Sequence, residues 1–328
     1  MDGRPRPCAL TELPYAARMK AIQFDAYGGS EVLHVVDVAA PQPAANQVRV
    51  RVHAVGVNPM EIKIRSGAMK DFVPTAFPAI PGMELAGTID ELGSGVTGLE
   101  VGDAVLGWSE TGAYAEHALA TQVVAKPAGL AWDVAAAIPV AVDTAHRVLE
   151  LLAVTTGDTV LIHGGAGVVG AMAVQLAILR GARVVATASP ADQDYVRSLG
   201  ATAVTYGDGL AARIAALGLP ARPGAPHGID AVLDAAGKGA LPVSIELRGD
   251  ASRIVTIADM GAQALGIPFS AGQPGDRNLP RVADVAKLVA AGTVQVPIGA
   301  HFSLADAPKA QDQVAAGGQR GKVILSVA

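Results

Sequence analysis

The glycine-rich segment between residues 159 and 170 constrains the fold of this chain more than any other part of it. An apolar run from Thr159 to His163 leads into Gly165-Ala-Gly-Val-Val-Gly170, and a helical pattern follows. The spacing Gly-x-Gly-x-x-Gly permits a tight turn, close approach of the backbone to a pyrophosphate and close packing of a helix on a strand. The free amides and the dipole at the start of that helix also attract an anion. We therefore predict a dinucleotide site whose loop residues are Gly165, Ala166, Gly167, Val168, Val169 and Gly170.

The length and composition predict two domains with cores of small aliphatic residues. With 328 residues, the chain exceeds the size of one ordinary core. Hydrophobic residues make up 51% of it, whereas charged residues make up 17% and aromatic residues 4%, which favours a buried parallel sheet. The net charge of -5 provides no basic field, so we expect neither a nucleic-acid partner nor an acidic membrane surface as partner.

No segment of the sequence has the length of a membrane span. The longest apolar stretch, Val168 to Leu179, contains Gln175 and stops at Arg180, short of the roughly 18 residues that a span needs. Residues 1–18 contain arginines and prolines but not the apolar core of a secretory signal, so we expect a flexible leader and a cytoplasmic protein. Cys8, the single cysteine, lies in this leader and cannot form an intrachain disulfide.

The pattern of the chain changes twice. Residues 19–139 contain short β-rich runs separated by Gly and Pro, which is typical of a compact antiparallel domain. Residues 140–292 alternate strands with helices, which indicates βαβ units and a parallel sheet. Residues 293–328 return to the first pattern, so we infer that the C-terminal end rejoins the first domain. The expected strands are 20–24, 47–55, 84–92, 104–106, 113–119, 159–163, 183–187, 229–234, 253–257 and 321–327, and the clearest helices are 168–180 and 192–199.

Further landmarks follow one another in order along the chain. They are Gly56-Val-Asn-Pro59, Pro81-Gly-Met-Glu-Leu-Ala-Gly87, Val101-Gly-Asp103, Gly112-Ala-Tyr-Ala-Glu116, Thr144-Ala145, the glycine loop and Gly321-Lys322. Together they resemble the zinc-independent quinone oxidoreductase branch of the medium-chain dehydrogenase/reductase superfamily, from about Met19 onwards. The resemblance implies an α/β fold, a Rossmann doubly wound parallel sheet plus a GroES-like, mostly β catalytic domain, with the nicotinamide in the cleft between them. It also implies a homodimer, and it assigns Thr144 and Lys322 to the cofactor site.

Zinc ligands are missing at the positions where zinc-bearing relatives carry them. The resemblance places a Cys near Asn58 and a His at Met83 in those relatives, and this chain has neither. A catalytic zinc takes about three protein ligands, and the structural zinc of these relatives takes four closely spaced cysteines. Four other candidate ligands stand at scattered positions: His53, Glu84, Asp103 and His117. Scattered histidines are more often structural or surface groups, so we predict no metal site.

The second strand of the nucleotide domain bears on the choice of cofactor. In an NAD site this strand usually ends in an acidic residue that binds the ribose 2'-hydroxyl. Here it ends at Ser189 without a carboxylate, and Ser189 at a helix start can donate to a 2'-phosphate, so NADPH is favoured. Ser189 also fits an N-cap, and both interpretations can hold. Asp192 and Asp194 weaken the preference, as does Gln193, which stands where many relatives have a phosphate-binding lysine. Tyr206 matches a family tyrosine that contacts the phosphate, or else its ring packs at a strand end.

Without a Lewis acid, reduction of a conjugated acceptor is more feasible than carbonyl–alcohol interconversion. Hydride from a nicotinamide would add to a quinone or to the β-carbon of an enone, and the cleft would donate hydrogen bonds to the developing oxyanion. Close positioning of the reacting atoms would carry much of the rate. We therefore expect an NADPH-dependent reductase of a small quinone or α,β-unsaturated carbonyl.

Three side chains are candidates for the chemistry: Asn58, Lys63 and Asp143. Asn58 fits a contact to the substrate or the nicotinamide, but Asn58-Pro-Met-Glu61 is also a capping box with proline at the first helical position. Lys63 stands where some quinone reductases have a tyrosine, and it fits either a proton donor or a solvated lysine. Asp143 fits either a carboxylate that faces the cleft or the N-cap of a helix.

Two aromatic residues and a methionine leave the acceptor open. Trp108 and Tyr114 either pack on a planar substrate or belong to the core. Met69 stands where quinone reductases often have an aromatic side chain, which weakens the case for a quinone. One alternative is an enoyl-thioester or pathway-specific tailoring reductase on the same scaffold. A second alternative is a dinucleotide-binding structural or regulatory protein without turnover, because a fold does not fix a function.

Overall fold

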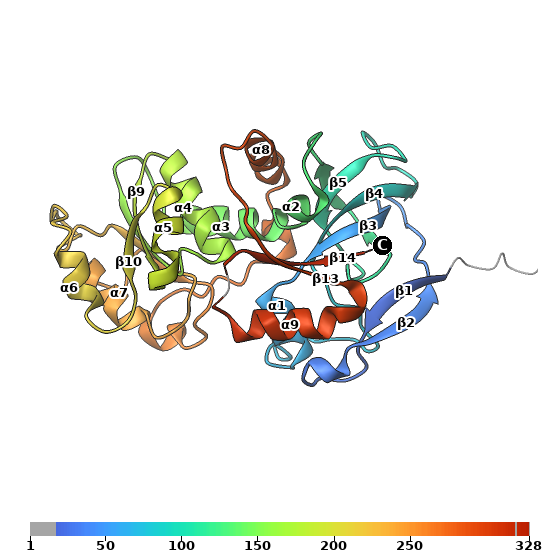
Figure 1. Cartoon of the computed structure of the whole chain (residues 1–328), viewed down its shortest axis with the longest axis horizontal. Coiled ribbons are helices and arrows are strands. Elements are labelled where there is room, and N and C mark those ends of the chain that lie inside the picture. Colours follow the sequence, from blue (N-terminus) through green and yellow to red (C-terminus); the bar gives the residue numbers. More distant parts are fainter. Residues whose placement is uncertain (1–17, 319, 328) are drawn as a thin grey trace, which may run out of the picture.

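Two sheets of different kinds define the two lobes of the structure, which describes residues 18–318 and 320–327 (Figure 1). This computed structural model has a parallel sheet in the lobe at the left of the figure and a mostly antiparallel sheet in the other. Helices α2 (Trp132–Ala136) and α3 (Pro139–Leu151) lie between the lobes. The predicted fold class, a Rossmann sheet plus a mostly β domain, is confirmed. The predicted leader, with Cys8, lies outside the described residues except for Arg18.

The parallel sheet has the strand order β10-β9-β8-β11-β12. Its strands are β8 (Thr159–His163), β9 (Arg183–Ala188), β10 (Thr202–Thr205), β11 (Ala231–Asp234) and β12 (Ile254–Thr256). The helices of this lobe are α4 (Val168–Leu179), α5 (Gln193–Ser198), α6 (Leu210–Ala215) and α7 (Leu241–Arg248), whereas α8 (Leu279–Ala290) packs against α3 and against β7 (Gln122–Ala125) of the other sheet. Every residue of β8 is buried at the centre of the sheet. The glycine loop therefore opens at the middle of the carboxyl edge, where open α/β sheets bind their ligands.

Helix α4 accounts for the longest apolar stretch of the sequence. It packs beside α3 and against β8 and β9, and it is buried from Gly170 to Ala177. A helix that is apolar on nearly every side belongs inside a protein or a bilayer. Among the described residues, no helix combines the length and the apolar character that crossing a membrane would require.

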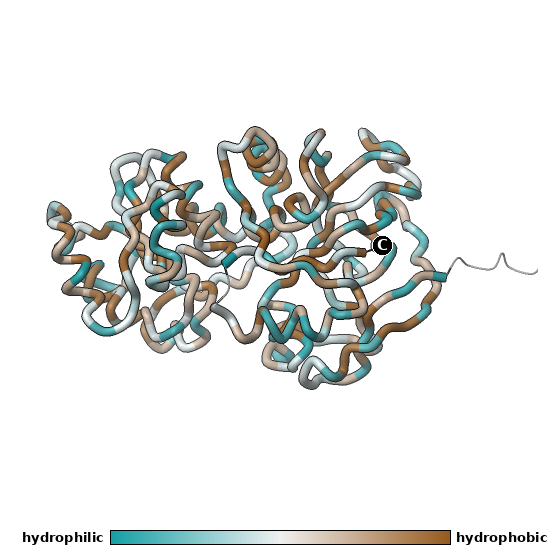
Figure 2. Tube along the Cα trace, viewed as in Figure 1, coloured by the Kyte–Doolittle hydropathy of each residue, from teal (hydrophilic) through white to brown (hydrophobic). Residues whose placement is uncertain are grey.

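The second large sheet has the order β13-β14-β3-β4-β5-β7, with β6 also paired to β3. Its strands are β3 (Val48–Gly56), β4 (Glu84–Leu92), β5 (Ala104–Trp108), β6 (His117–Ala120), β7 (Gln122–Ala125), β13 (Ile298–Ser303) and β14 (Lys322–Ser326). Helices α1 (Pro59–Arg65) and α9 (Ala307–Ala316) lie in the same lobe. β14 pairs antiparallel with β3, so the C-terminal end rejoins the first domain as predicted. In Figure 2, β14 is mostly coloured as hydrophobic, in agreement with the burial of its centre.

The first domain differs from the sequence prediction in three strands. A hairpin of β1 (Arg18–Gln23) and β2 (His34–Ala39) stands apart from the large sheet, and neither β2 nor β7 was predicted. The predicted strand at 113–119 is wrong over its first half, because β6 begins only at His117. The preceding residues are a buried loop whose amides donate to the carbonyls of Pro81 and Gly82. A buried loop with apolar residues resembles a strand when only the sequence is considered.

The two lobes share one hydrophobic core. This core joins Ala54, Ala86 and Leu106 of the β lobe to α2, α3 and α4, and it extends to β8 and β9. The predicted boundary at 139/140 falls where α3 begins, and the boundary at 292/293 falls just after α8. Since the shared core crosses the first of these positions, the domain boundaries stay predictions.

Candidate active site

In the loop between β8 and α4, each glycine is required for a different local reason. Gly164, at φ +77°, makes the tight turn, and the Gly165 amide donates to the Thr187 carbonyl at 2.8 Å. A Cβ on Gly165 would lie 2.7 Å from the Cβ of Ala186 on β9. A Cβ on Gly170 would overlap the carbonyl of Gly164, so the helix can pack on the loop only with glycine there. The loop thus has the close packing that its spacing predicts, although the tight turn is made one residue earlier.

Gly167 is the exception, because its missing side chain leaves open space. A Cβ at Gly167 would meet only the Gly164 carbonyl, at 3.4 Å, and Gly167 has an ordinary φ of −72°. Gly167 is the N-cap of α4 and offers no side-chain acceptor to the first-turn amides, which belong to Val168, Val169 and Gly170. A helix end with unpaired amides and an open approach fits a pyrophosphate. The residues present therefore fit a dinucleotide.

A buried histidine supports this loop from behind. His163, the last residue of β8, is 2% exposed, and its Nε2 lies 3.0 Å from the Ser244 hydroxyl on α7. Its Nδ1 lies 3.4 Å from Thr187 Oγ1, which in turn accepts the Gly164 amide at 3.2 Å. Burial lowers the pKa of His163 to about 4, although the charge of Asp234 acts in the opposite direction. A neutral imidazole therefore stands beneath the turn, a role that the sequence analysis missed.

The end of β9 presents a mixed surface to the ribose of a dinucleotide. The Ser189 hydroxyl donates to Asp192 Oδ2 at 2.7 Å, and Gln193 Nε2 donates to the carbonyls of Ala188 and Ser189. Tyr206 is 53% exposed, so it does not pack in the core. The loop that carries Tyr206 is held by Arg213, whose guanidinium donates to four consecutive carbonyls from Thr205 to Asp208. Ser189 and Tyr206 remain predictions for a phosphate contact.

Asn58 and Lys322 meet at the inner end of β3. Lys322 Nζ donates to Asn58 Oδ1 at 2.6 Å and forms an ion pair with Glu84 Oε1. Asn58 Nδ2 donates to Glu84 Oε1 at 3.0 Å and to Glu61 Oε1 at 3.2 Å. Glu84 Oε2 accepts the amide of Val140, at the start of α3. Lys322 is 3% exposed, Asn58 5% and Glu84 0%, so the three side chains form a polar cluster that is closed to water.

Glu61 and Tyr114 extend this cluster. Tyr114 donates to Glu61 Oε2 at 2.7 Å, and the amides of Asn58 and Met83 donate to Glu61 at 3.2 and 3.0 Å. Burial raises the pKa of Glu61 against the effect of these hydrogen bonds. Burial, together with the neighbouring Glu61, also raises the pKa of Tyr114 well above its usual value. Tyr114 is 0% exposed, so the alternative in which its ring packs on a substrate is wrong.

The Asn58 cluster bears on the two interpretations of that residue. The Asn58 amide donates to Glu61 as a capping box requires, and Pro59 starts α1. Its side-chain amide is already bonded to protein groups on both its nitrogen and its oxygen. The capping interpretation is therefore correct, whereas contact with substrate or nicotinamide stays a prediction.

Lys63, Asp143 and Thr144 lie around the junction of the lobes. Lys63 Nζ stands 5.9 Å from the ring centroid of Phe269, which belongs to the parallel-sheet lobe, and the two interpretations of Lys63 stay predictions. Asp143 lies in the second turn of α3 rather than at its start, so the N-cap interpretation is wrong. Its Oδ1 accepts the Asn278 amide at 3.1 Å, and burial raises the pKa of its carboxyl. Thr144 is partly buried beside it.

Trp108 and Met69 are both core residues. Trp108 is 2% exposed, and the guanidinium of Arg277 stands 5.1 Å from its ring centroid. Met69 is 4% exposed. The alternative in which Trp108 packs on a substrate is therefore wrong.

The candidate metal ligands have other partners. His53 Nε2 contacts Thr88 Oγ1 at 3.0 Å, and its ring stacks on Trp132, whereas Glu84 is paired with Lys322. Within residues 18–318 and 320–327, no three His, Cys, Asp or Glu side chains are grouped as a metal ion would require.

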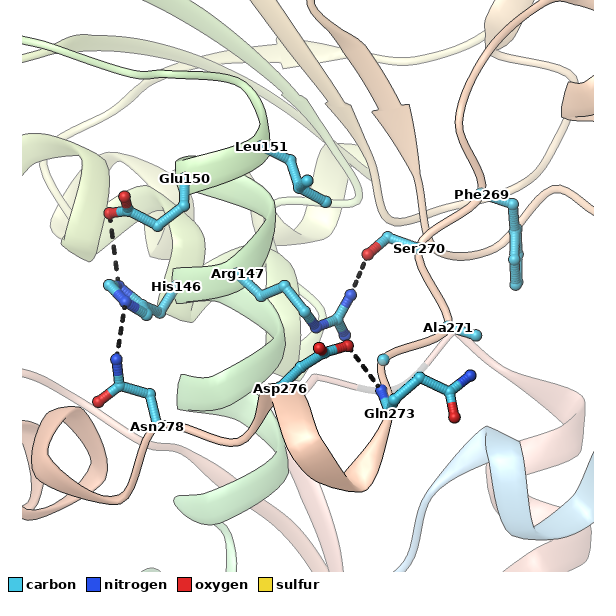
Figure 3. Close-up of a pocket in the computed structure, with 11 residues that line it drawn as sticks. His146, Arg147, Glu150, Leu151, Phe269, Ser270, Ala271, Gln273, Asp276 and Asn278 are labelled. Atoms are coloured by element: carbon cyan, nitrogen blue, oxygen red, sulfur yellow. Dashed lines mark hydrogen bonds and ion pairs between the residues drawn. The ribbon is translucent and has the colours of Figure 1, made fainter.

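A cavity of about 630 Å³ opens between α3 and the segment 269–278 (Figure 3). Its lining residues are His146, Arg147, Glu150, Leu151, Phe269, Ser270, Ala271, Gly272, Gln273, Asp276 and Asn278. The segment leaves the edge of the parallel sheet, where Phe269 bridges to Thr256. It then reaches the β lobe, where Arg277 donates to Gln122 at 2.9 Å. The cavity therefore lies at the junction of the two lobes.

Two family models match the chain. Residues 44–133 match the alcohol dehydrogenase GroES-like domain, and residues 199–325 match a model described as zinc-binding dehydrogenase. A curated relative, the chloroplastic quinone-oxidoreductase homolog of Spinacia oleracea, is 38% identical over 201 residues. That alignment covers 58% of this chain and 61% of the spinach protein, so the chain spans less than two thirds of the length of this relative.

Solved structures match over nearly the whole chain. The quinone oxidoreductase from Coxiella burnetii superposes with a TM-score of 0.82 at 31% identity, covering 95% of this chain and 100% of the other. A mycobacterial protein solved in complex with NADPH superposes with a TM-score of 0.80 at 27% identity, covering 94% and 99%.

Proposed function

Because this chain belongs to the quinone oxidoreductase branch of the medium-chain dehydrogenase/reductase superfamily, we propose that it is an NADPH-dependent reductase that works without zinc. Its acceptor would be a quinone or an α,β-unsaturated carbonyl. The observation that carries this proposal is the open space at Gly167, on the unpaired amides of α4, at the carboxyl edge of the sheet. NADPH bound there would supply the hydride.

The residues of this chain would bind the cofactor and the acceptor, orient them towards each other and exclude water. Gly165 and Gly170 let the loop pack closely enough to expose the amides of α4, and His163 with Thr187 holds the turn. Thr144 and Lys63 are proposed to face the nicotinamide and the acceptor from opposite lobes. A hydrogen bond from the half-buried Lys63 would stabilise an oxyanion as it develops. The carbon or oxygen that takes the last proton can obtain it from water.

The residues also support a reaction without a bound zinc. Met83 and Asn58 replace the histidine and the cysteine at the positions of the zinc ligands. Glu84, the acidic residue next to Met83, is neutralised by the Lys322 ammonium. A cation added beside this lysine would meet charge repulsion in a site closed to water.

The proposed preference for NADPH rests on the end of β9. The strand ends without a carboxylate on its last residue, and the exposed Tyr206 hydroxyl is available to a phosphate. Asp192 opposes this preference, and Gln193 supplies no charge. We expect kcat/KM with NADPH to exceed that with NADH by about tenfold or more, a difference of about 1.4 kcal/mol in transition-state stabilisation. Equal values for both cofactors would contradict the preference.

A fluorescence titration with NADPH and NADH tests the site before any acceptor is chosen. We expect Gly167→Val to weaken NADPH binding by about 100-fold or more, because its side chain fills the space in front of the α4 amides. The fold should remain, since φ is ordinary and the new side chain meets little protein. Ala215→Val, on the exposed side of α6, is the control and should bind as the wild type does. Unchanged binding in a folded Gly167→Val variant would show that the nucleotide lies elsewhere.

The family also leads us to propose a homodimer and a cytoplasmic location. Light scattering of the purified protein tests the first, and a mass of one chain at micromolar concentration would contradict it. Assay of quinones, enones and enoyl thioesters with NADPH then separates the proposed reductase from its two alternatives. NADPH binding without oxidation by any of these acceptors would favour a binding protein without turnover.

A further inference from the structure

The cavity between α3 and the segment 269–278 contains an arginine that has no ion pair. Arg147 extends from α3 across the cavity, and its guanidinium donates to the Ser270 hydroxyl (Figure 3). Its Nε is buried and has no hydrogen-bond partner. Among the described residues, no Asp or Glu oxygen lies within ion-pair distance of this side chain. A buried donor without an acceptor costs about 1–3 kcal/mol, and more when it is charged, so the surrounding protein leaves the Arg147 guanidinium incompletely satisfied.

The carboxylates of the cavity have other partners. Glu150 pairs with Arg180 at 2.8 Å, and Asp276 Oδ2 accepts the backbone amide of Gln273 at 3.0 Å. Asp143, four residues before Arg147 on α3, accepts the Asn278 amide. Asp143 and Asp276 are near enough to act on Arg147 electrostatically, but burial outweighs them and lowers the pKa of its guanidinium.

Two other arginines show that an unpaired Nε alone would not distinguish Arg147. Arg222 and Arg248 also have a buried Nε without a partner. Arg222, however, is paired with Asp230, and Arg248 donates to the Gly224 carbonyl in a loop. Arg147 differs because it stands in a cavity and its one acceptor within the part of the chain that the structure describes is a neutral hydroxyl.

The cavity borders the place where the acceptor of the proposed reaction would lie. Arg147 follows Thr144 by three residues on α3, so the two side chains share one face of the helix. Across the cavity, Phe269 forms an apolar wall, and Lys63 of α1 reaches to 5.9 Å from its ring. A small organic anion would therefore meet an apolar surface and two cations, Arg147 and Lys63, beside the carboxylates of Glu150 and Asp276, which have partners of their own.

We propose that this cavity binds the carboxylate of the acceptor, with Arg147 as its main partner. The preferred acceptors are then conjugated carbonyls that carry a carboxylate rather than neutral quinones. That the bound anion is the acceptor of the reaction rests on the proposed function. The existence of an anion site at Arg147 does not depend on it.

A matched pair of enones tests the proposal in the full-length protein. The anionic member is (E)-4-oxopent-2-enoate and the neutral member is its methyl ester. In both, hydride forms a C–H bond at the carbon β to the ketone, the C=C electron pair moves to the ketone oxygen, and the enolate takes a proton from water. The measurement is kcat/KM for each acceptor at saturating NADPH.

Three variants separate anion binding from a structural role. Arg147→Gln should lower kcat/KM for the anionic acceptor by about tenfold to a hundredfold, as expected when a charge-assisted hydrogen bond is lost, and leave the ester within about twofold. Ser270→Ala removes the link from Arg147 to the segment but keeps the guanidinium, so it should retain the preference for the anion. Arg183→Gln changes an exposed arginine at the far end of β9 and should change neither value. An equal loss for both acceptors, or no loss for either, would overturn the proposal.

Direct binding keeps this inference separate from the proposed function. Levulinate, the saturated product, is titrated into wild type and Arg147→Gln by calorimetry without any cofactor. Binding to the wild type that is about tenfold weaker in the variant supports the site, even if NADPH fails to bind and the reductase proposal falls. If NADPH binds and the ester is reduced, but levulinate does not bind and the anion is not preferred, the reductase proposal stands and this inference falls.

Discussion

Lys322 and Glu84 form an ion pair that is almost wholly removed from water. Their side chains are 3% and 0% exposed, and they join β14 to β4. Gly56 leaves the room for this pair, because a Cβ there would overlap Glu84 Oε1 and crowd Lys322 Cε. Desolvation offsets much of the attraction in such a pair, but the loss of one partner leaves a buried charge. Removal of one side chain should therefore cost more than removal of both.

We predict that Lys322→Met lowers the free energy of unfolding by about 3–5 kcal/mol. The double variant Lys322→Met with Glu84→Gln should recover at least ~1 kcal/mol of this loss, because no uncompensated charge remains. Urea unfolding of the wild type, both single variants and the double variant measures the coupling. The exposed pair Lys309–Asp306 serves as the control, and there we expect no measurable coupling. Strictly additive effects at Lys322 and Glu84 would contradict the prediction.

The sequence could supply only part of this cluster. The capping box around Asn58 is local, so its spacing revealed it. Tyr114 and Glu84, in contrast, meet the same cluster from strands and loops far along the chain. Their neighbours in sequence are apolar or glycine, and no local pattern marks a partner at such a distance. Of the two interpretations of Asp143, the N-cap is wrong because α3 begins four residues earlier, at a proline after an alanine-rich run.

At the scale of elements, β8, β9 and α7 combine to hold the glycine loop. β8 supplies His163, β9 supplies Thr187 and α7 supplies Ser244, and their polar atoms form a chain that ends on the Gly164 amide. Ser244 also donates to the Ala240 carbonyl at 2.6 Å, so its hydroxyl hydrogen is used within α7. Nε2 of His163 then donates to Ser244, and burial, which lowers the pKa of the ring to about 4, keeps His163 neutral near pH 7. The glycine loop is thus held in place by the side chains of His163, Thr187 and Ser244.

We predict that His163 makes the stability of the protein depend on pH. Its pKa is about 4 in the folded state and 6.5 in the unfolded chain, so the unfolded state binds the proton first as the pH falls. The contribution is fully present above pH 6.5, and about 3 kcal/mol is lost as the pH falls through about 4.

Thermal unfolding at a series of pH values between 7 and 4.5 tests this dependence. His163→Asn keeps a hydrogen-bonding side chain but does not titrate, so its melting temperature should fall less steeply with acid than that of the wild type. His34→Asn, at an exposed position, is the control and should follow the wild type. If His163→Asn has the same slope as the wild type, His163 is not the responsible group.

The elements themselves were predicted where the pattern is periodic or punctuated by glycine. The strands at 84–92 and 159–163 match the structure in full, and α4 ends one residue earlier than expected. β2 was missed because its residues are partly exposed and lack a clear alternation with a buried face. Residues 113–116 were misassigned because a loop that packs inside the protein carries the same apolar residues as a strand.

At the scale of the whole molecule, the two lobes are packed as one unit. One core extends from β3, β4 and β5 through α2 and α3 to the parallel sheet. The segment 269–278 adds a second connection, through Arg277 with Trp108 and Gln122. Neither lobe can lose its structure without exposing apolar surface of the other. We therefore expect the lobes to unfold together.

We predict a single cooperative unfolding transition in the absence of ligand. Tryptophan fluorescence reports on the β lobe and its border, through Trp108 on β5 and Trp132 on α2, whereas circular dichroism also reports on the helices of the other lobe. The two probes should give the same urea midpoint. A fluorescence midpoint that differs from that of circular dichroism would show that the lobes unfold separately.

The return of β14 to the first sheet also determines the order in which a ribosome can complete this protein. The parallel-sheet lobe is synthesised after β3 and before β13 and β14, so it has all of its strands while the sheet of the β lobe lacks these two. During that interval, residues 54–56 of β3 have no strand on the side that β14 later covers. An open strand edge is a place where nascent chains associate. The speed of translation between residues 159 and 321 therefore sets how long each new chain is exposed to pairing with its neighbours on the same messenger.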